Sequence, residues 1–152
     1  MPWDPLPYNL TRTQSRVSVP LNLANQVPQL PGVYVIFSTQ KDTIEDRIID
    51  IGMAGLRKGQ GLRGRIASAV AHSASENMAD DIANGTLPDA LQIVWINTDT
   101  QPEAKGLEEA LITLFQNEFG RRPMYNGNGG HVANYGIYQP TYDALKLHIG
   151  QL

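Results

Sequence analysis

Proline is concentrated at the start of the chain, and this distribution most limits where regular secondary structure can form. Six of the ten prolines lie within the first 31 of the 152 residues. Each proline fixes its own φ, lacks an N–H donor and disfavours helical backbone at the residue before it. We therefore expect residues 1–30 to form an extended Pro-rich arm with at most one short strand or turn, and residues 31–152 to form a single domain.

Hydrophobic patterning after residue 31 predicts three strands and three helices. Residues 33–37, 47–51 and 91–96 are rich in β-branched and aromatic side chains, as is typical of strands. Apolar residues recur at helical spacing over 62–74 and 107–115. The second of these helices begins with Thr100 and Glu103 at the spacing of a capping box, and Gly120 stands where helices commonly end. A last short helix is expected over 141–149.

The order of these elements predicts a small α/β sandwich. In this β-β-α-β-α arrangement a central three-stranded, mainly antiparallel sheet is flanked by helices, and one further helix follows at the C-terminal end. Residues 38–46 and 52–61 are expected to be loops, and the first of them is short enough to favour antiparallel pairing of the first two strands.

Composition excludes several classes of protein. Twelve basic and fifteen acidic residues leave a net charge of −3, so a general nucleic-acid coat or a membrane-surface protein is not expected. Without cysteine there are no disulfides, thiol nucleophiles or thiolate zinc sites. No segment approaches the ~18 apolar residues of a membrane span, and the first residues lack the regions of a secretory signal. We expect a soluble, cytoplasmic protein.

A basic cluster interrupts this acidic background. Residues 51–75 contain no acidic residue and four basic ones, which are Arg57, Lys58, Arg63 and Arg65. The cluster falls on a glycine-rich loop and on the first turn of the helix that follows, where backbone N–H groups favour anions. It is either a solvated basic turn or a phosphate-binding site.

Five short motifs follow one another through residues 31–126. They are Gly32-Val33-Tyr34, Asp50-Ile51-Gly52, Leu62-Arg63-Gly64-Arg65-Ile66, Glu108-Glu109-Ala110-Leu111-Ile112 and Pro123-Met124-Tyr125-Asn126. In this order, on these predicted strands and helices, the chain resembles the GIY-YIG nuclease domain. That family includes homing endonucleases, some restriction enzymes and the nuclease half of a nucleotide-excision-repair subunit. A literal Gly-Ile-Tyr at 136–138 is not the motif, because only 14 residues follow it.

The resemblance implies hydrolysis of a phosphodiester bond with one Mg²⁺ or Mn²⁺ and without a covalent intermediate. Glu108, in preference to Glu109, would be the metal ligand, since a hard cation takes oxygen ligands. Arg65, in preference to Arg63, would hold the phosphoryl oxygens and offset the charge that grows in the transition state.

The resemblance also gives roles to Tyr34 and Asn126. Tyr34 would orient the attacking water or take its proton. A tyrosine has a pKa of about 10, so it needs positive charge nearby to act as a base at neutral pH. Asn126 would make hydrogen bonds that position the helix or the phosphate.

The chain departs from the family pattern at three positions. Asp50 stands where the second tyrosine of the family would be, and it would act as a general base, act as a second metal contact or repel the phosphate. Ala69 stands where many members have histidine, for which His72 is a partial substitute on the same helical face. Met53 follows the glycine where lysine is frequent.

These features predict an endonuclease that cuts DNA, with RNA as the alternative. Its contacts would be mostly to phosphate and sensitive to salt, and would come from Arg57, Lys58, Arg63, His72, Arg121 and Arg122. No separate DNA-reading module is visible, so target choice would come from loops, a homo-oligomer or a partner protein. The alternatives are a catalytically inactive module that binds nucleic acid or protein, and an unrelated small α/β protein.

Overall fold

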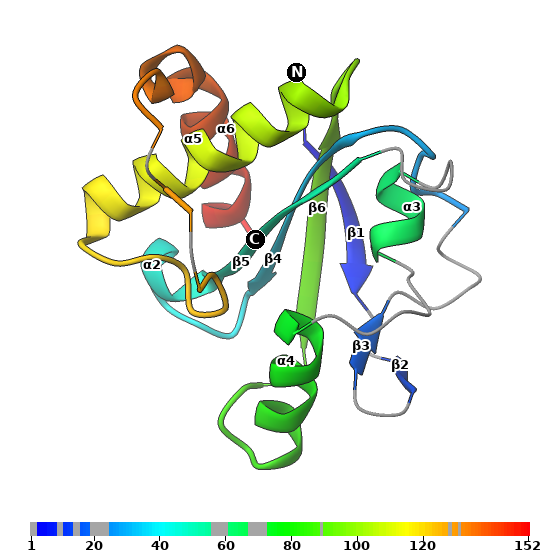
Figure 1. Cartoon of the computed structure of the whole chain (residues 1–152). Helices are drawn as coiled ribbons and strands as arrows, with labels where there is room; N and C mark the ends of the chain where they lie inside the picture. The colour runs from blue at the N-terminus through cyan, green and yellow to red at the C-terminus, as the bar shows by residue number, and fades with distance from the viewer. Residues whose placement is uncertain are drawn as a thin grey trace.

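The computed structural model describes residues 3–8, 11–13, 16–18, 25–55, 61–66, 73–88, 90–127, 129–130 and 132–152 (Figure 1). Four positions discussed above, Arg57, Lys58, Ala69 and His72, lie outside these described residues. The α/β fold class is confirmed, and the three predicted strands and the last two predicted helices occur in the expected order. The prediction was wrong in two places: a short helix at Ile44–Arg47 begins within the expected loop 38–46, and two helices, Gly61–Ile66 and Ser73–Ala83, occur where one was expected over 62–74.

Four antiparallel strands form the central sheet (Figure 1). The strand β4 (Gly32–Ser38) pairs with β5 (Ile48–Ala54) on one side and with β6 (Leu91–Asn97) on the other. These are the three predicted strands, and their antiparallel pairing is confirmed. The strand β1 (Asp4–Tyr8) extends the sheet beyond β6, so the order is β1-β6-β4-β5.

The N-terminal arm contains more strand than its proline content suggested. Its described residues include β1, β2 (Thr11–Thr13) and β3 (Arg16–Ser18), and the last two pair with each other. Pro5 and Pro7 alternate along β1, so their missing N–H groups fall on the same side of the strand. Because β1 lies at the edge of the sheet, one side of it has no neighbouring strand, and proline is tolerated in such edge strands.

Helices cover both faces of the sheet. They are α2 (Ile44–Arg47), α3 (Gly61–Ile66), α4 (Ser73–Ala83), α5 (Gln101–Phe119) and α6 (Gln139–Gly150), and the 3-10 helix η2 (Tyr135–Tyr138) comes before α6. Among the described residues, no helix has both the length and the apolar character that crossing a membrane requires.

The ends of α5 match the predicted signals. The hydroxyl oxygen of Thr100 accepts a hydrogen bond from the N–H of Glu103 at 3.2 Å, and Gly120 ends the helix with a φ of 77°. Some other boundaries differ from the prediction. Arg47 belongs to α2 instead of a strand, and β5 continues to Ala54 within the expected loop.

Hydrophobic side chains pack in two layers, one on each face of the sheet. Because neighbouring residues of a strand face opposite ways, β4 sends Val33, Val35 and Phe37 to one layer and Tyr34 and Ile36 to the other. The first layer is completed by α5 and α6, and the second by α3 and α4. Tyr34 therefore lies in the layer beneath the helices that follow the glycine-rich loop.

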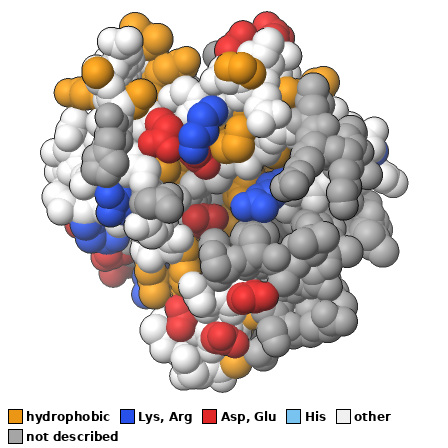
Figure 2. Space-filling view, in the orientation of Figure 1, with side chains coloured by type: hydrophobic (Ala, Val, Ile, Leu, Met, Phe, Trp, Pro, Cys, Tyr) orange, Lys and Arg blue, Asp and Glu red, His pale blue; other side chains and the backbone are white. Residues whose placement is uncertain are grey.

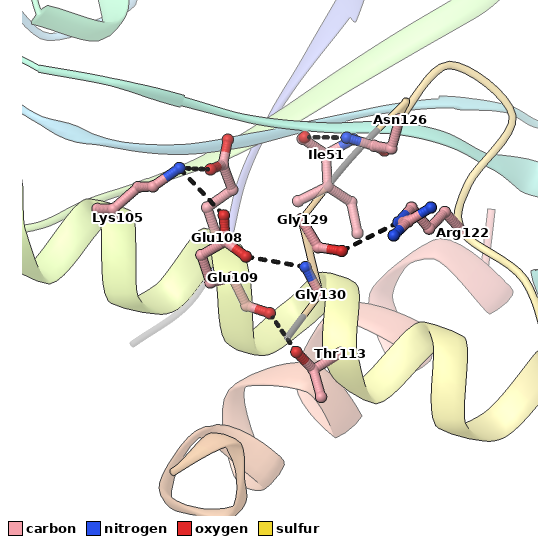
Figure 3. Close-up of polar contacts among 9 residues, drawn as sticks. All are labelled: Ile51, Lys105, Glu108, Glu109, Thr113, Arg122, Asn126, Gly129 and Gly130. Carbon is pink, nitrogen blue, oxygen red and sulfur yellow. Dashed lines mark hydrogen bonds and ion pairs between the residues drawn. The ribbon is translucent and has the colours of Figure 1, made fainter. Parts of the chain in front are cut away.

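The chain segment after α5 is attached to the open edge of β5. The side-chain oxygen of Asn126 accepts a hydrogen bond from the N–H of Ile51 at 3.0 Å, and its amide nitrogen donates to the carbonyl of Ile51 at 2.8 Å (Figure 3). The N–H of Tyr125 also donates to the carbonyl of Ile49 at 2.9 Å. These bonds satisfy backbone groups that an edge strand otherwise leaves unpaired. Asn126 thus positions the segment after α5 against the sheet.

We expect Asn126→Ala to lower the free energy of unfolding by about 1–3 kcal/mol, because two half-buried backbone groups of β5 lose their partner. Chemical denaturation with circular dichroism measures the change. The control is Asn84→Ala, which removes one exposed hydrogen bond to Thr86. A loss for Asn126→Ala no larger than that of the control would contradict the positioning role.

Candidate functional site

Tyr34 is placed by the middle strand of the sheet. It stands opposite Gly52 on β5 and Trp95 on β6, and only 3% of it is exposed. Its ring lies across the strand at Gly52, so that a Cβ added to this glycine would overlap the ring and would stand 2.8 Å from Cε1 of Tyr34. The glycine of the Asp50-Ile51-Gly52 motif is therefore what gives the phenol its room.

Asp50 lies on β5 two residues before Gly52, and so on the same face of the strand. It is 4% exposed, which is unusual for an aspartate. Burial and, to a smaller extent, the charge of Glu108 raise the pKa of Asp50, the charge of Arg65 lowers it, and the net pKa is about 7. Near neutral pH this carboxyl group is divided between its protonated and ionised forms.

Arg65 reaches the site from α3. The residue is exposed, and its side chain forms a hydrogen bond with the hydroxyl of Tyr34. Burial and the charge of Asp50 raise the pKa of Tyr34 far above its usual value, and Arg65 offsets this only in part. The phenol is therefore neutral. Because a guanidinium only donates hydrogen bonds, the phenolic proton must point to another partner.

Glu108 reaches the site from α5. Its side chain is 14% exposed, and its Oε1 lies 3.2 Å from Nζ of Lys105 (Figure 3). Burial raises the pKa of Glu108, while Lys105 and Arg65 lower it. The charge of Glu108 in turn contributes to the raised pKa values of Tyr34 and Asp50.

Glu109 contacts a backbone group in addition to Lys105. Its Oε2 accepts a hydrogen bond from the N–H of Gly130 at 2.8 Å, and its Oε1 lies 3.0 Å from Nζ of Lys105 (Figure 3). Glu109 thus holds the glycine-rich segment, whereas Glu108 acts on the charges of Tyr34, Asp50 and Arg65. This difference favours Glu108 over Glu109 as the acidic residue of the site.

Four predicted site residues therefore lie close enough to influence one another's charge, and we refer to Tyr34, Asp50, Arg65 and Glu108 as the charge cluster. They come from β4, β5, α3 and α5. The positive charge of Arg65 lowers the pKa of each of the three acidic groups. Figure 2 shows acidic and basic side chains facing one another in the middle of this face, between α5 and α3.

The predicted DNA-contacting residues within the described part of the chain have intramolecular partners. Nε of Arg63 donates to the carbonyl of Val27 at 2.8 Å, which attaches α3 to the segment before β4. Nε of Arg122 donates to the carbonyl of Gly129 at 3.0 Å (Figure 3). Arg121 pairs with acidic residues of α2. The remaining predicted contacts, Arg57, Lys58 and His72, lie outside the described residues.

A groove of about 370 Å³ lies beside the first residues of β5. Ile48 and Ile49 form part of its wall, and Lys41 and Arg121 stand in its lining. None of the four residues of the charge cluster lines it. The groove is therefore a neighbour of the site and not the site itself.

The pattern of motifs did not indicate two further contacts near the site. The hydroxyl of Tyr125 donates to Oδ2 of Asp81 at 2.7 Å, joining the segment after α5 to α4, and Asp50 contributes to the raised pKa of Tyr125. Glu109 holds Gly130 in the same region. Both contacts join residues more than twenty positions apart, and no local signal in the sequence marks them.

The donor set of the charge cluster fits a small divalent cation. No group of three or more His, Cys, Asp or Glu side chains that would enclose a metal occurs among the described residues. Mg²⁺, however, is commonly held by one or two carboxylates, with water and substrate phosphate completing its shell. Glu108 offers such a carboxylate, and its repulsion of Asp50 indicates a site that is short of positive charge.

Comparison of the chain with protein-family models, with curated proteins and with solved structures found no match. The charge cluster and the order of motifs in the sequence are therefore the features that bear on function.

We expect Gly52→Ala to displace the ring of Tyr34 and to lower the free energy of unfolding by about 1–3 kcal/mol, the usual range for an overpacked core. Thermal and chemical denaturation measure the loss. In a Tyr34→Ala background the same substitution should be nearly neutral, because the ring it would meet is gone. Gly136→Ala is the control, since a Cβ there meets nothing within 4 Å. An equal loss in both backgrounds would contradict the assigned contact.

Burial of Asp50 makes stability depend on pH in a defined direction. Its pKa in the folded state, about 7, lies above the unfolded value of 3.8, so the folded protein retains a proton that the unfolded chain releases. The corresponding stability is present below about pH 4 and is lost as the pH rises through 7.

We therefore expect Asp50→Asn to stabilise the metal-free protein more at pH 8 than at pH 5, by a difference on the order of 2 kcal/mol. Denaturation in EDTA at the two pH values measures it, and exposed Asp42→Asn reports the general effect of removing one carboxylate. The assignment fails if the gain for Asp50→Asn is the same at both pH values.

Proposed function

We propose that this chain is a divalent-metal-dependent endonuclease that hydrolyses phosphodiester bonds of DNA, with RNA as the alternative substrate. One observation supports the proposal most strongly: a phenol, a guanidinium and two carboxylates from four elements act on one another's charge. Phosphodiester hydrolysis needs a cation for the phosphoryl oxygens, an acceptor for the proton of water and an oxygen ligand for a metal.

Glu108 is the residue that would hold the metal. Its carboxylate is half-buried at the edge of the cluster, and the burial that raises its pKa also strengthens its attraction for a cation. When bound there, Mg²⁺ or Mn²⁺ would polarise the phosphate and stabilise the leaving oxygen.

Arg65 and Tyr34 would position the reacting groups. The exposed guanidinium of Arg65 is suited to hold two phosphoryl oxygens and to offset the charge that grows on them. Tyr34 keeps its proton because its pKa is raised, so it would orient the attacking water by donating a hydrogen bond and would not take the water's proton.

Asp50 is the proton acceptor in this scheme. As the oxygen of water forms its bond to phosphorus, one proton of the water passes to the carboxylate of Asp50 and the bond between phosphorus and the leaving oxygen breaks. A base with a pKa near the operating pH suits this task. Of the roles considered for an aspartate in place of the second tyrosine, general base is the one that its burial beside Tyr34 supports.

A catalytically inactive module that binds nucleic acid or protein is the second candidate. Two observations favour this module over the enzyme. When Asp50 is ionised, its negative charge would repel a phosphate held by Arg65. In addition, Arg63 and Arg121 already have partners within the chain. Glu108 favours the enzyme, because a second carboxylate adds repulsion to a site that only binds phosphate. In either case a second copy or a partner protein would supply target selection.

We expect the purified chain to nick supercoiled plasmid in Mn²⁺, and Glu108→Gln to lower the rate by about 100-fold or more, as loss of a metal ligand or transition-state contact typically does. Gel densitometry over time measures the rate. Glu103→Gln, an exposed glutamate in the first turn of the same helix, is the matched control and should leave the rate unchanged.

Several nucleic acids are tested, because the enzyme would be missed if it cut only one kind of substrate. Single-stranded DNA, branched DNA and RNA are tested beside the plasmid, each with Mg²⁺ and with Mn²⁺. If none of them is cut, the binding module replaces the enzyme as the preferred function.

A further inference from the structure

Lys105 lies between two carboxylates of α5, of which only one belongs to the charge cluster. Its Nζ is 3.2 Å from Oε1 of Glu108 and 3.0 Å from Oε1 of Glu109 (Figure 3). The side chain is 60% exposed, whereas those of Glu108 and Glu109 are 14% and 21% exposed. An exposed ammonium therefore neutralises a largely buried carboxylate.

The two carboxylates differ in how firmly they are held. The Oε2 of Glu109 is fixed by the N–H of Gly130 at 2.8 Å, which leaves its Oε1 directed at Lys105. The hydrogen bond with Glu109 is also the largest cause of the raised pKa of Lys105, ahead of its contacts with Glu108. If Lys105 leaves Glu108, the ammonium retains a fixed partner in Glu109, and only the carboxylate of Glu108 loses its counter-ion.

We propose that Lys105 is a resident counter-cation of Glu108 that competes with the divalent metal and moves onto Glu109 when the metal binds. The inference rests on the proposed function, in which Glu108 is the metal ligand. The physical basis is competition between two cations for one carboxylate. A metal ion that binds Glu108 while Lys105 is still there is repelled by the ammonium, so it must displace Lys105 or bind more weakly beside it. Glu109 lowers the barrier to this exchange by providing the second place for Lys105.

Lys105→Met tests the competition. It keeps the approximate length of the side chain and removes its charge, and we expect the dissociation constant for Mn²⁺ alone to fall by about twofold to fivefold, the size of an exposed ion pair. Electron paramagnetic resonance of free Mn²⁺, with no nucleic acid present, measures the binding. Lys146→Met is the matched control, because it removes the same charge from a pair with Glu118, near the C-terminal end of α5. Equal or weaker binding by Lys105→Met than by the wild type would overturn the proposal.

Glu109→Gln tests the movement of Lys105 onto Glu109, and it should change the affinity for Mn²⁺ in the opposite direction to Lys105→Met. The amide oxygen can still accept from Gly130, but Lys105 loses its second carboxylate and stays on Glu108, so Mn²⁺ should bind about threefold more weakly. In the Lys105→Met background the same substitution should have no effect. If it weakens binding equally in both backgrounds, Glu109 acts on the metal directly, and the exchange is wrong.

Glu108→Gln separates this inference from the proposed function. Loss of Mn²⁺ binding in Glu108→Gln together with unchanged binding in Lys105→Met would reject the competition and leave the metal site in place. Unchanged Mn²⁺ binding in Glu108→Gln would reject Glu108 as the metal ligand, and with it both proposals. Circular dichroism of each variant confirms that the change in binding does not come from unfolding.

Discussion

The position of β4 between β5 and β6 is the constraint on which the rest of the structure depends. It sends Tyr34 to the layer beneath α3 and α4, while Val33 and Val35 go to the layer beneath α5. Gly52, opposite Tyr34 on β5, leaves room for the ring. A slip of one residue between β4 and β5 would move Asp50 to the other face, because side chains alternate along a strand.

The charge balance of the cluster follows from this arrangement. Asp50 and Tyr34 are buried by the sheet and its covering helices, and burial disfavours the charged form of both. Arg65 is the cation that acts on both of them, and it offsets the burial only in part. A buried site with more acidic than basic groups retains protons or attracts cations, and both properties are useful in the hydrolysis of a phosphate ester.

The sequence predicted the residues of the site better than it predicted their partners, because the partners lie far away along the chain. The motif order assigned Tyr34, Asp50, Arg65 and Glu108, and the structure brings their charges together. The sequence also assigned Arg63 and Arg121 to nucleic acid, and in the structure both side chains contact groups of this chain. Those partners lie 36 and 76 positions away, so no local pattern could have shown them.

The sequence by itself determined the three strands β4, β5 and β6, the start and end of α5 and the residue types available at the site. These depend on side-chain alternation, on the cap formed by Thr100 and on the left-handed backbone at Gly120, all of which act within a few residues. Only the tertiary structure decided that β1 joins the sheet, that Glu109 holds Gly130 and that Glu108 faces the cluster. The reason is that each of these depends on the distance between groups far apart in the chain, which is set only when the layers pack.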